Sequence, residues 1–318
     1  MSEEQGRVLI TGANGHLGRR LVARLTGPAG GRPLRTVVRS ERAAQQLAAL
    51  PEAARAETVI LDYADVEALS QAAAGCSHAV HLVGILKEDS TRRYADAHEA
   101  TTRALAAAAA AQGLSRIVYL GILGSHPDAP NACLASKGRA ERILLEAQTP
   151  ALVLRVPMVL GEGDIASRAL RAQARARLAP LLRGGRSLEQ PIYAGDVVEA
   201  ILRGVSQPGL DDVVLELAGP ESLSRRALLE RAARLHGTRP LVVPIPLGLN
   251  LGIALLLERL LANPPITRAM LGVLNHDDVV DPAEPCRRLG LELTPLDEAL
   301  RRCVGPAAAG IPAEGETT

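Results

Sequence analysis

Short apolar runs alternate along the first half of the chain with stretches in which apolar residues recur every three or four positions. The runs predict buried strands at 7–11, 34–38, 57–62, 78–84, 116–124 and 151–156. The periodic stretches predict helices at 17–25, after 38, at 65–75, at 91–112 and at 137–147. Strands that are apolar on both faces and alternate with helices are typical of a doubly wound parallel sheet. We therefore expect an α/β fold.

The rhythm changes after about residue 157. Helical stretches at 165–178, 194–205 and 224–236 are separated by proline-rich links, with short strands near 213–219 and 240–246. We expect a sheet domain over 1–160, on which the helix at 194–205 packs back, a smaller interleaved lobe over 161–304, and a disordered tail over 305–318. The most apolar stretch, 246–265, predicts a buried helix of the lobe. A helix at a membrane interface, or one facing a quinone, is the alternative.

Composition narrows the choice of partner. The chain has 318 residues, of which 47% are apolar and 22% charged, with a formal net charge of +1. These values indicate a soluble globular protein and argue against nucleic acid as its main partner. Four Tyr and no Phe or Trp leave no stacking platform for single-stranded nucleic acid.

Targeting and redox signals favour a cytoplasmic protein. The start, MSEEQG, is acidic and unlike a signal peptide. No apolar run reaches the ~18 residues of a membrane-spanning helix, although association with a membrane surface stays open. The four cysteines are far apart, without zinc-binding spacing, and we expect reduced thiols. We expect no metal site.

A glycine-rich loop carries the clearest local chemistry. Gly12, Gly15 and Gly18 follow the first predicted strand directly and open the first predicted helix. Glycine lets the backbone turn tightly and approach a pyrophosphate, and the helix N-terminus offers free N–H groups to its charges. The strand–turn–helix context is the one that this motif requires. The sequence predicts a dinucleotide site here; a glycine turn without a ligand is the alternative.

Further motifs accompany this loop: Asp62 after the third strand, HLVG at 81–84, Lys137, LRVPMVLGEGD and PIYAGDVVEAIL. With TGANGHLG, they resemble the short-chain dehydrogenase/reductase superfamily in its extended and atypical, epimerase/dehydratase-like branches. The likeness is greatest to the subgroup of the nucleotide-binding accessory subunit of respiratory complex I and its bacterial relatives. The resemblance implies a Rossmann-type sheet and a bound nicotinamide dinucleotide. The cofactor-binding residues that we predict are Thr11, Gly12, Asn14, Gly15, His16, Leu17, Gly18, Arg39, Asp62, Tyr63, Val83, Gly84, Lys137, Val156 and Pro157.

The end of the second strand bears on which dinucleotide is preferred. NAD-dependent relatives place an acidic residue there to accept hydrogen bonds from the ribose hydroxyls. This chain reads VVRS, with Arg39 at that place. A guanidinium suits a 2′-phosphate, so NADP(H) is favoured over NAD(H). A solvated surface arginine is the alternative.

The catalytic motif departs from that of active relatives, which carry Ser and YxxxK. Lys137 matches the lysine, but the position four residues earlier is Cys133, and Ser125 is the nearest hydroxyl to the usual serine place. Lys87 and Lys137 are the only lysines among 36 basic residues, which favours a specific role for Lys137 over that of an ordinary surface lysine. We predict Lys137, Cys133 and Ser125 as the degenerate catalytic set. A thiol that exchanges protons and one that merely fills space both remain open.

The remaining polar residues receive structural interpretations first. We expect His81 to be a hydrogen-bonded core histidine and His98 to support the cofactor end of the sheet. Tyr119 reads as core and Tyr193 as pocket wall. Arg155 and Asp196 either line a substrate cleft or form an ion pair.

Three functions follow from these observations. The first is an NAD(P)(H)-binding protein with little dehydrogenase activity, acting as a cofactor-sensing or accessory protein for an unknown small molecule or protein partner. The second is an active NADP(H)-dependent oxidoreductase or an NAD-dependent nucleotide-sugar epimerase or dehydratase. The third is an interaction protein with a vestigial glycine loop.

Overall fold

The computed structural model describes residues 6–26, 31–50, 56–246, 248, 255, 261, 267–274 and 277–307. Contacts divide the chain into two compact units: Met1–Arg155 with Val198–Leu215, and Val156–Val197 with Glu216–Thr318. The predicted helix over 246–265 and the predicted tail beyond 307 lie mostly outside the described residues.

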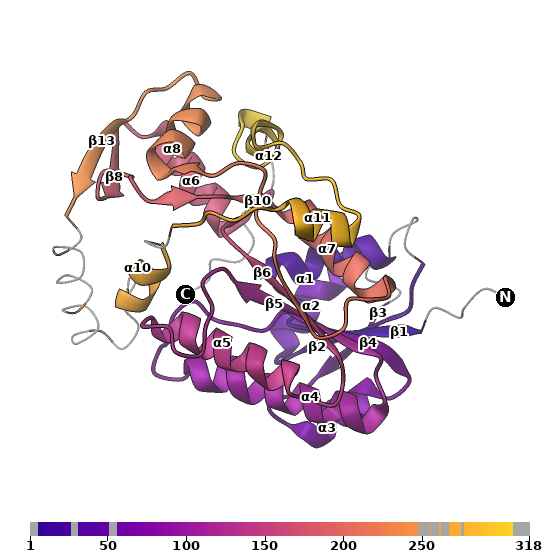
Figure 1. Ribbon diagram of the computed structural model, residues 1–318. Coiled ribbons are helices and arrows are strands. Elements are labelled where there is room, and N and C mark those ends of the chain that lie inside the picture. The colour runs from indigo at the N-terminus through magenta and orange to yellow at the C-terminus, as the bar shows by residue number, and fades with distance from the viewer. Residues whose placement is uncertain are drawn as a thin grey trace. The chain divides into compact units, whose positions relative to one another are not determined.

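The first unit is built on a seven-stranded sheet (Figure 1). Its spatial order is β11-β6-β5-β4-β1-β2-β3, so the order reverses between β1 and β4. The pairs from β3 through β2, β1 and β4 to β5 are parallel. Ligands of open parallel sheets bind at the carboxyl ends of the strands, where the order reverses. The strands are β1 (Arg7–Thr11), β2 (Leu34–Val38), β3 (Ala56–Ile60), β4 (Cys76–His81), β5 (Arg116–Ile122), β6 (Ala151–Val156) and β11 (Val213–Glu216).

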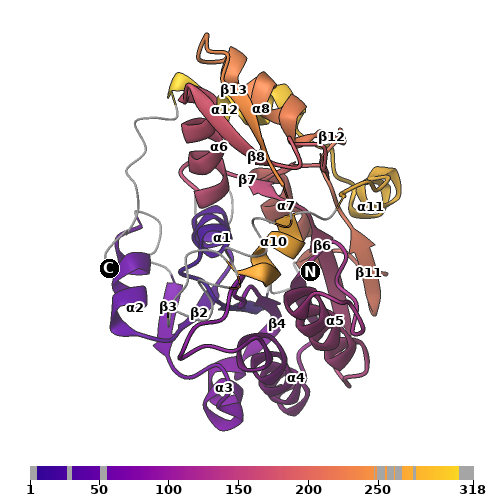
Figure 2. The ribbon, with the colours of Figure 1, turned by 90° about the vertical axis from the view of Figure 1, so that its left-hand side faces the viewer.

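Helices cover both faces of this sheet, with α3, α4 and α5 side by side on one face (Figure 2). Without Phe or Trp, the core on that side is filled by Leu, Val, Ile and many Ala, and the small Ala side chains of α4 let the helices pack closely. Side chains of Ser40, Asp65 and Asn131 cap the N-termini of α2, α3 and α5. The helices are α1 (His16–Thr26), α2 (Glu41–Ala48), α3 (Val66–Ala73), α4 (Thr101–Gln112) and α5 (Ala132–Leu145).

The helix predicted over 91–112 begins only at Tyr94, so its first three residues are not helical. The Asp89 carboxylate accepts hydrogen bonds from the backbone N–H groups of Thr91 and Arg92, which holds this segment in a turn. A π-helix, η2 (Ala95–Ala100), follows and leads into α4. Hydrogen bonding by a short acidic side chain competes with the helical ladder here.

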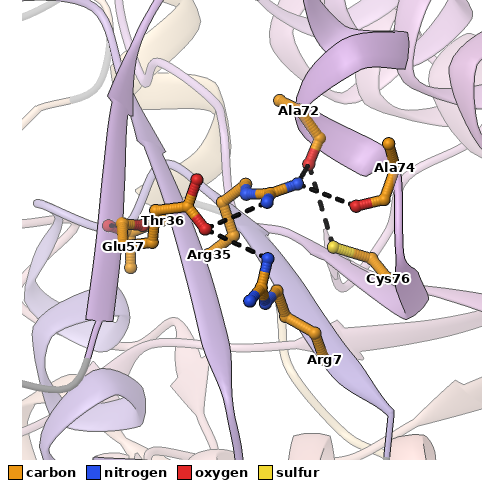
Figure 3. Close-up of polar contacts among 7 residues, drawn as sticks. All are labelled: Arg7, Arg35, Thr36, Glu57, Ala72, Ala74 and Cys76. Carbon is orange, nitrogen blue, oxygen red and sulfur yellow. Dashed lines mark hydrogen bonds and ion pairs between the residues drawn. The ribbon is translucent and has the colours of Figure 1, made fainter.

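An arginine-rich cluster joins the amino ends of three strands (Figure 3). Glu57 on β3 accepts hydrogen bonds from Arg35 at 2.9 Å and Arg7 at 3.0 Å. Arg35 Nη1 also donates to the carbonyl oxygens of Ala72 (2.6 Å) and Ala74 (2.9 Å), where α3 ends. Carbonyls at a helix C-terminus attract cations, so Arg35 fixes α3 to the sheet at the edge opposite the strands' carboxyl ends.

The second unit contains three two-stranded sheets and several helices. Its strand pairs are β7 (Val159–Leu160) with β10 (Ile192–Tyr193), β9 (Leu188–Glu189) with β12 (Leu223–Ser224), and β8 (Leu178–Leu182) with β13 (Leu241–Ile245). Its helices include α6 (Ile165–Arg175), α8 (Arg225–Arg234), α10 (Arg268–Leu274), α11 (Ala283–Leu289) and α12 (Leu296–Cys303), while α7 (Ala194–Ser206) has residues in both units.

The helix predicted over 165–178 ends early, at Arg175, and Leu178 begins strand β8. The apolar residues of LAPLL (178–182) are compatible with the periodicity of a helix and with that of a strand. Their pairing with β13 is what makes this segment a strand. No helix among the described residues is long and apolar enough to cross a membrane.

Candidate functional site

The loop between β1 and α1 forms the first wall of the candidate site. Gly12 adopts a left-handed conformation with φ of 74°, and a Cβ there would lie 3.0 Å from the backbone of Leu82. A Cβ on Gly18 would lie 2.5 Å from the Ala13 carbonyl oxygen. The first turn of α1 carries no acidic residue, so nothing offsets the positive end of the helix dipole. The predicted glycines are those that this close backbone packing requires.

A cavity of about 600 Å³ lies at this loop. It collects side chains and backbone from the carboxyl ends of β1, β2, β3 and β4, and is large enough for part of a dinucleotide. Eight predicted residues line it, together with three that the prediction missed, Ser40, Ala43 and Leu82. The eight are Gly12, Asn14, Gly15, Arg39, Asp62, Tyr63, Val83 and Gly84.

Tyr63 fixes the shape of this cavity. Its hydroxyl accepts a hydrogen bond from the Gly12 N–H and donates one to the Val37 carbonyl, both at 3.1 Å. The guanidinium of Arg39 lies 5.7 Å from the centre of the Tyr63 ring. Burial raises the pKa of Tyr63, so the phenol stays neutral and acts as a brace between β1 and β2. Arg39 and Ser40 are exposed and face the cavity at the N-terminus of α2.

Lys137 is buried beneath the floor of the cavity. Its Nζ donates to the Leu120 carbonyl oxygen at 3.1 Å and lies 4.6 Å from the centre of the Tyr119 ring. A Cβ on cavity-lining Gly84 would be 3.0 Å from this Nζ, which places the ammonium directly behind the Gly84 wall of the cavity. Burial lowers the pKa of Lys137 to about 8, which costs stability and indicates a functional reason for the charge.

Two neutral imidazoles lie near this lysine. His81 Nδ1 is 2.6 Å from the Thr11 hydroxyl, and its ring stacks on Tyr119. His98, carried on η2, places Nε2 3.1 Å from both the N and the O of Ile85. Burial, and then the charge of Lys137, lowers the pKa of each imidazole to about 3. His81 is the satisfied core histidine that the sequence predicted.

Cys133 lies one helical turn before Lys137 on α5, as the spacing predicted. The thiol is fully buried and donates to the Ile85 carbonyl oxygen at 3.7 Å. Burial raises its pKa to about 11, although the charge of Lys137 and a hydrogen bond with Tyr94 each act to lower it. Cys133 is therefore a neutral thiol at physiological pH.

Tyr94 is a site residue that sequence reasoning missed. Its hydroxyl donates to the Leu86 carbonyl at 2.9 Å and interacts with the Cys133 thiol, and its ring stacks on His98. No motif marked this residue, because it precedes η2 and only the fold brings it to α5. Ser125 is buried, and its hydroxyl has no hydrogen-bond partner among the described residues.

The remaining predicted residues have these places. Arg155 forms an ion pair with Glu141, in which Nε at 2.9 Å and Nη2 at 2.7 Å both donate to Glu141 Oε2. Asp196 accepts hydrogen bonds from Thr294. Tyr119 is a core residue, and the Tyr193 hydroxyl is 2.7 Å from Glu162. His16 and Leu17 begin α1; Val156 ends β6, and Pro157 follows it. For all the predicted cofactor-binding residues, contact with a cofactor stays a prediction.

Comparisons with known proteins agree with this geometry. A family model described as NAD(P)H-binding matches residues 12–176, more than half of the chain. The ceramide reductase of Caulobacter vibrioides is 28% identical over 246 residues, covering 77% of this chain and 75% of that protein. NADH dehydrogenase [ubiquinone] 1 alpha subcomplex subunit 9, mitochondrial, of Arabidopsis thaliana is 24% identical over 273 residues, 85% of this chain and 68% of that one.

A solved structure shares the fold. UDP-glucuronic acid 4-epimerase of Bacillus cereus, in complex with UDP-glucuronic acid and NAD, superposes with a TM-score of 0.72. The match covers 94% of this chain and 98% of that chain at 14% identity. The likeness confirms the predicted doubly wound α/β fold.

Proposed function

The chain belongs to the NAD(P)H-binding family, and on that premise we propose that it binds NADP(H) in preference to NAD(H) and transfers hydride poorly. It serves as a cofactor-sensing or accessory protein in the cytoplasm. The observation that carries the proposal is the fully buried, neutral Cys133 thiol at the position where the family resemblance places a tyrosine.

The residues around the cavity support dinucleotide binding. The β1–α1 loop offers backbone N–H groups to a pyrophosphate, and Lys137 lies beneath Gly84. A bound nicotinamide would supply a hydride donor or acceptor. Arg39 and Ser40 offer a guanidinium and a hydroxyl at a helix N-terminus, which together suit a ribose 2′-phosphate.

Poor turnover follows from the lack of an accessible proton donor at Cys133. Positioned acid–base catalysis contributes about 10²–10⁴-fold in rate, or about 3–5 kcal/mol of barrier. A buried thiol that donates to the Ile85 carbonyl does not face a substrate. Lys137 can still hold a ribose hydroxyl, so binding is retained while proton transfer is weakened.

The test is calorimetric titration of the full chain with NADPH, NADP⁺, NADH and NAD⁺. We expect NADPH to bind more tightly than NADH, and Arg39→Ala to weaken NADPH binding about tenfold or more while leaving NADH nearly unchanged. Arg42→Ala, three residues further on in α2, is the matched control and should change neither affinity. Equal losses for both nucleotides in Arg39→Ala would contradict the 2′-phosphate contact, and no binding of any nucleotide would refute the proposal.

A second candidate is an active NADP(H)-dependent oxidoreductase, and Tyr94 is the observation that favours it. Its hydroxyl interacts with Cys133, and it would act as a proton donor by exchanging its hydrogen bond to the Leu86 carbonyl oxygen for one to the substrate. Under this alternative, Tyr94→Phe lowers turnover of a carbonyl substrate about 10²-fold or more, and Cys133→Ser leaves it nearly unchanged. Unchanged turnover in Tyr94→Phe would exclude this role. An NAD-dependent nucleotide-sugar epimerase or dehydratase has support only from the shared fold.

A further inference from the structure

The sheet formed by β8 and β13 has an unusual construction. The two strands pair in parallel, with Leu178 opposite Leu241 and Val243 opposite Pro180, and no third strand joins them in the described structure (Figure 2). Parallel strands are normally covered on both faces, because their side chains are apolar on both. Here the two faces differ.

One face of this sheet packs into the core of the second unit. Ala179 and Leu181 of β8 are buried in the cluster that includes Leu170 of α6 and Leu228 of α8, and Val242 packs against the same cluster. The opposite face carries Leu178, Pro180, Leu241 and Val243, all exposed. Leu178 is 57% exposed, Leu241 65% and Val243 39%. We call these four residues the β8–β13 apolar face.

Basic residues surround this face in the sequence. The segment 165–187 contains six arginines and no acidic residue, and 231–246 contains three arginines and no acidic residue. Six of these nine are exposed, and their side chains form no ion pair within the described part of the chain; they are Arg175, Arg177, Arg183, Arg186, Arg234 and Arg239. Elsewhere in the described residues, exposed arginines commonly pair with Glu or Asp, as Arg203 does with Glu199.

We propose that the β8–β13 apolar face binds the surface of a lipid bilayer that contains anionic phospholipids. Exposed apolar side chains enter the interfacial region of a bilayer, and unpaired arginines beside them contact anionic headgroups. A protein partner would have to provide apolar and acidic groups together, whereas an anionic bilayer provides both over any area. The chain after β13 continues apolar, with no charged residue from Pro240 to Leu257.

This proposal is independent of the nucleotide site, which lies in the first unit. The β8–β13 apolar face would be the part of the molecule responsible for the membrane association that the sequence analysis left open. The binding that we propose is peripheral, with the β8–β13 apolar face lying in the interfacial region of the bilayer.

The test is flotation of the full chain with vesicles of phosphatidylcholine alone and with phosphatidylcholine plus phosphatidylglycerol. We expect binding to the anionic vesicles, little to the neutral ones, and weakening by 0.5 M salt. Leu178→Ser with Leu241→Ser should lower vesicle affinity about tenfold or more. Each of Arg177→Gln and Arg183→Gln should lower it about fivefold.

Matched controls are Val66→Ser on α3, which changes an apolar side chain of similar exposure, and Arg142→Gln on α5, which removes an exposed arginine. Neither should change vesicle binding, and circular dichroism of every variant reports that the chain is folded, independently of nucleotide binding. Absence of vesicle binding, equal binding to neutral vesicles, or equal losses in the controls would overturn the proposal. So would a lipid-free dimer that Leu178→Ser with Leu241→Ser dissociates, because the face would then be covered by a second copy.

Discussion

Globular proteins usually bury apolar side chains and expose polar ones, and each unit has a region that does the opposite. The first unit buries charged and polar side chains, and the second exposes apolar ones. Around β4 and β5, the first unit buries an ammonium, a carboxylate and two imidazoles: Lys137, Glu141, His81 and His98. At β8 and β13, the second unit exposes Leu178, Leu241 and Val243. Both arrangements cost stability, and natural sequences tolerate such costs mainly where function requires them. The comparison teaches that each proposal rests on a local departure of this kind: the nucleotide site on buried polar groups in the first unit, and the membrane-binding face on exposed apolar groups in the second.

The largest expected effect is a difference in the free energy of unfolding between variants of two leucines, one in a strand of each unit. Leu9 in β1 is fully buried, whereas Leu241 in β13 is 65% exposed. Leu9→Ala should lower the free energy of unfolding by about 2–5 kcal/mol, because it removes buried methyl groups and leaves a cavity. Leu241→Ala should change it by less than about 0.5 kcal/mol. Urea unfolding of both variants measures this, and a loss above about 2 kcal/mol for Leu241→Ala would show that its side chain is covered in solution.

The second prediction concerns the buried charge of the first unit. The pKa of Lys137 falls from 10.5 to about 8 on folding. Below pH 8 the folded chain bears the full cost of the buried ammonium, up to about 3 kcal/mol at about 1.4 kcal/mol per pKa unit. Lys137→Met should therefore raise the stability at pH 7.

The pH dependence of this effect has a defined sign. Between pH 8 and 10.5 the unfolded lysine binds a proton that the folded one lacks, so the wild type gains stability as pH rises. The advantage of Lys137→Met should shrink over this window and vanish above it, as measured by urea unfolding at pH 7, 8.5 and 10. Lys87→Met, at the only other lysine, is the control and should show no such trend. A constant difference across pH would contradict a lowered pKa.

The smallest expected effect is the difference in the free energy of unfolding between variants of Arg35 and Arg7, two arginines of the cluster in Figure 3. Arg35 donates to two carbonyl oxygens at the end of α3 as well as to Glu57, whereas Arg7 pairs with Glu57 alone in the cluster drawn. Arg35→Met should cost about 1–2 kcal/mol of unfolding free energy, and Arg7→Met at most about 1 kcal/mol. The difference should persist in 0.5 M salt, because Arg35 is the less exposed of the two. Equal losses would show that the ion pair, and not the bonds to α3, fixes this edge of the sheet.

Local patterns predicted the first unit well. The glycine loop, Arg39 and Asp62 each follow a strand directly, so a short stretch of chain places them at one edge of the sheet, where they line the cavity. The predicted likeness to the extended and atypical short-chain dehydrogenase/reductases and to the complex I subunit is confirmed by the comparisons.

The failures share one cause, which is dependence on distant residues. The helix predicted over 165–178 extends into Leu178, the first residue of β8, and no element is predicted for the rest of that strand, because its partner β13 lies far along the chain. Pro180 also obscured β8, although a two-stranded sheet has open edges where proline is tolerated. Its partner β13 confirms the short strand predicted near 240–246. Tyr94 reaches Cys133 only through the turn at Asp89 and the π-helix, neither of which hydrophobic periodicity reveals.

The π-helix η2 sets the direction in which the His98 side chain points. A π-turn holds one residue more than an α-turn. Removal of one residue between His98 and α4 would turn His98 by about 100° around the helix axis relative to α4. The imidazole would then point away from Ile85, so the contact between His98 and the Ile85 backbone depends on this extra residue.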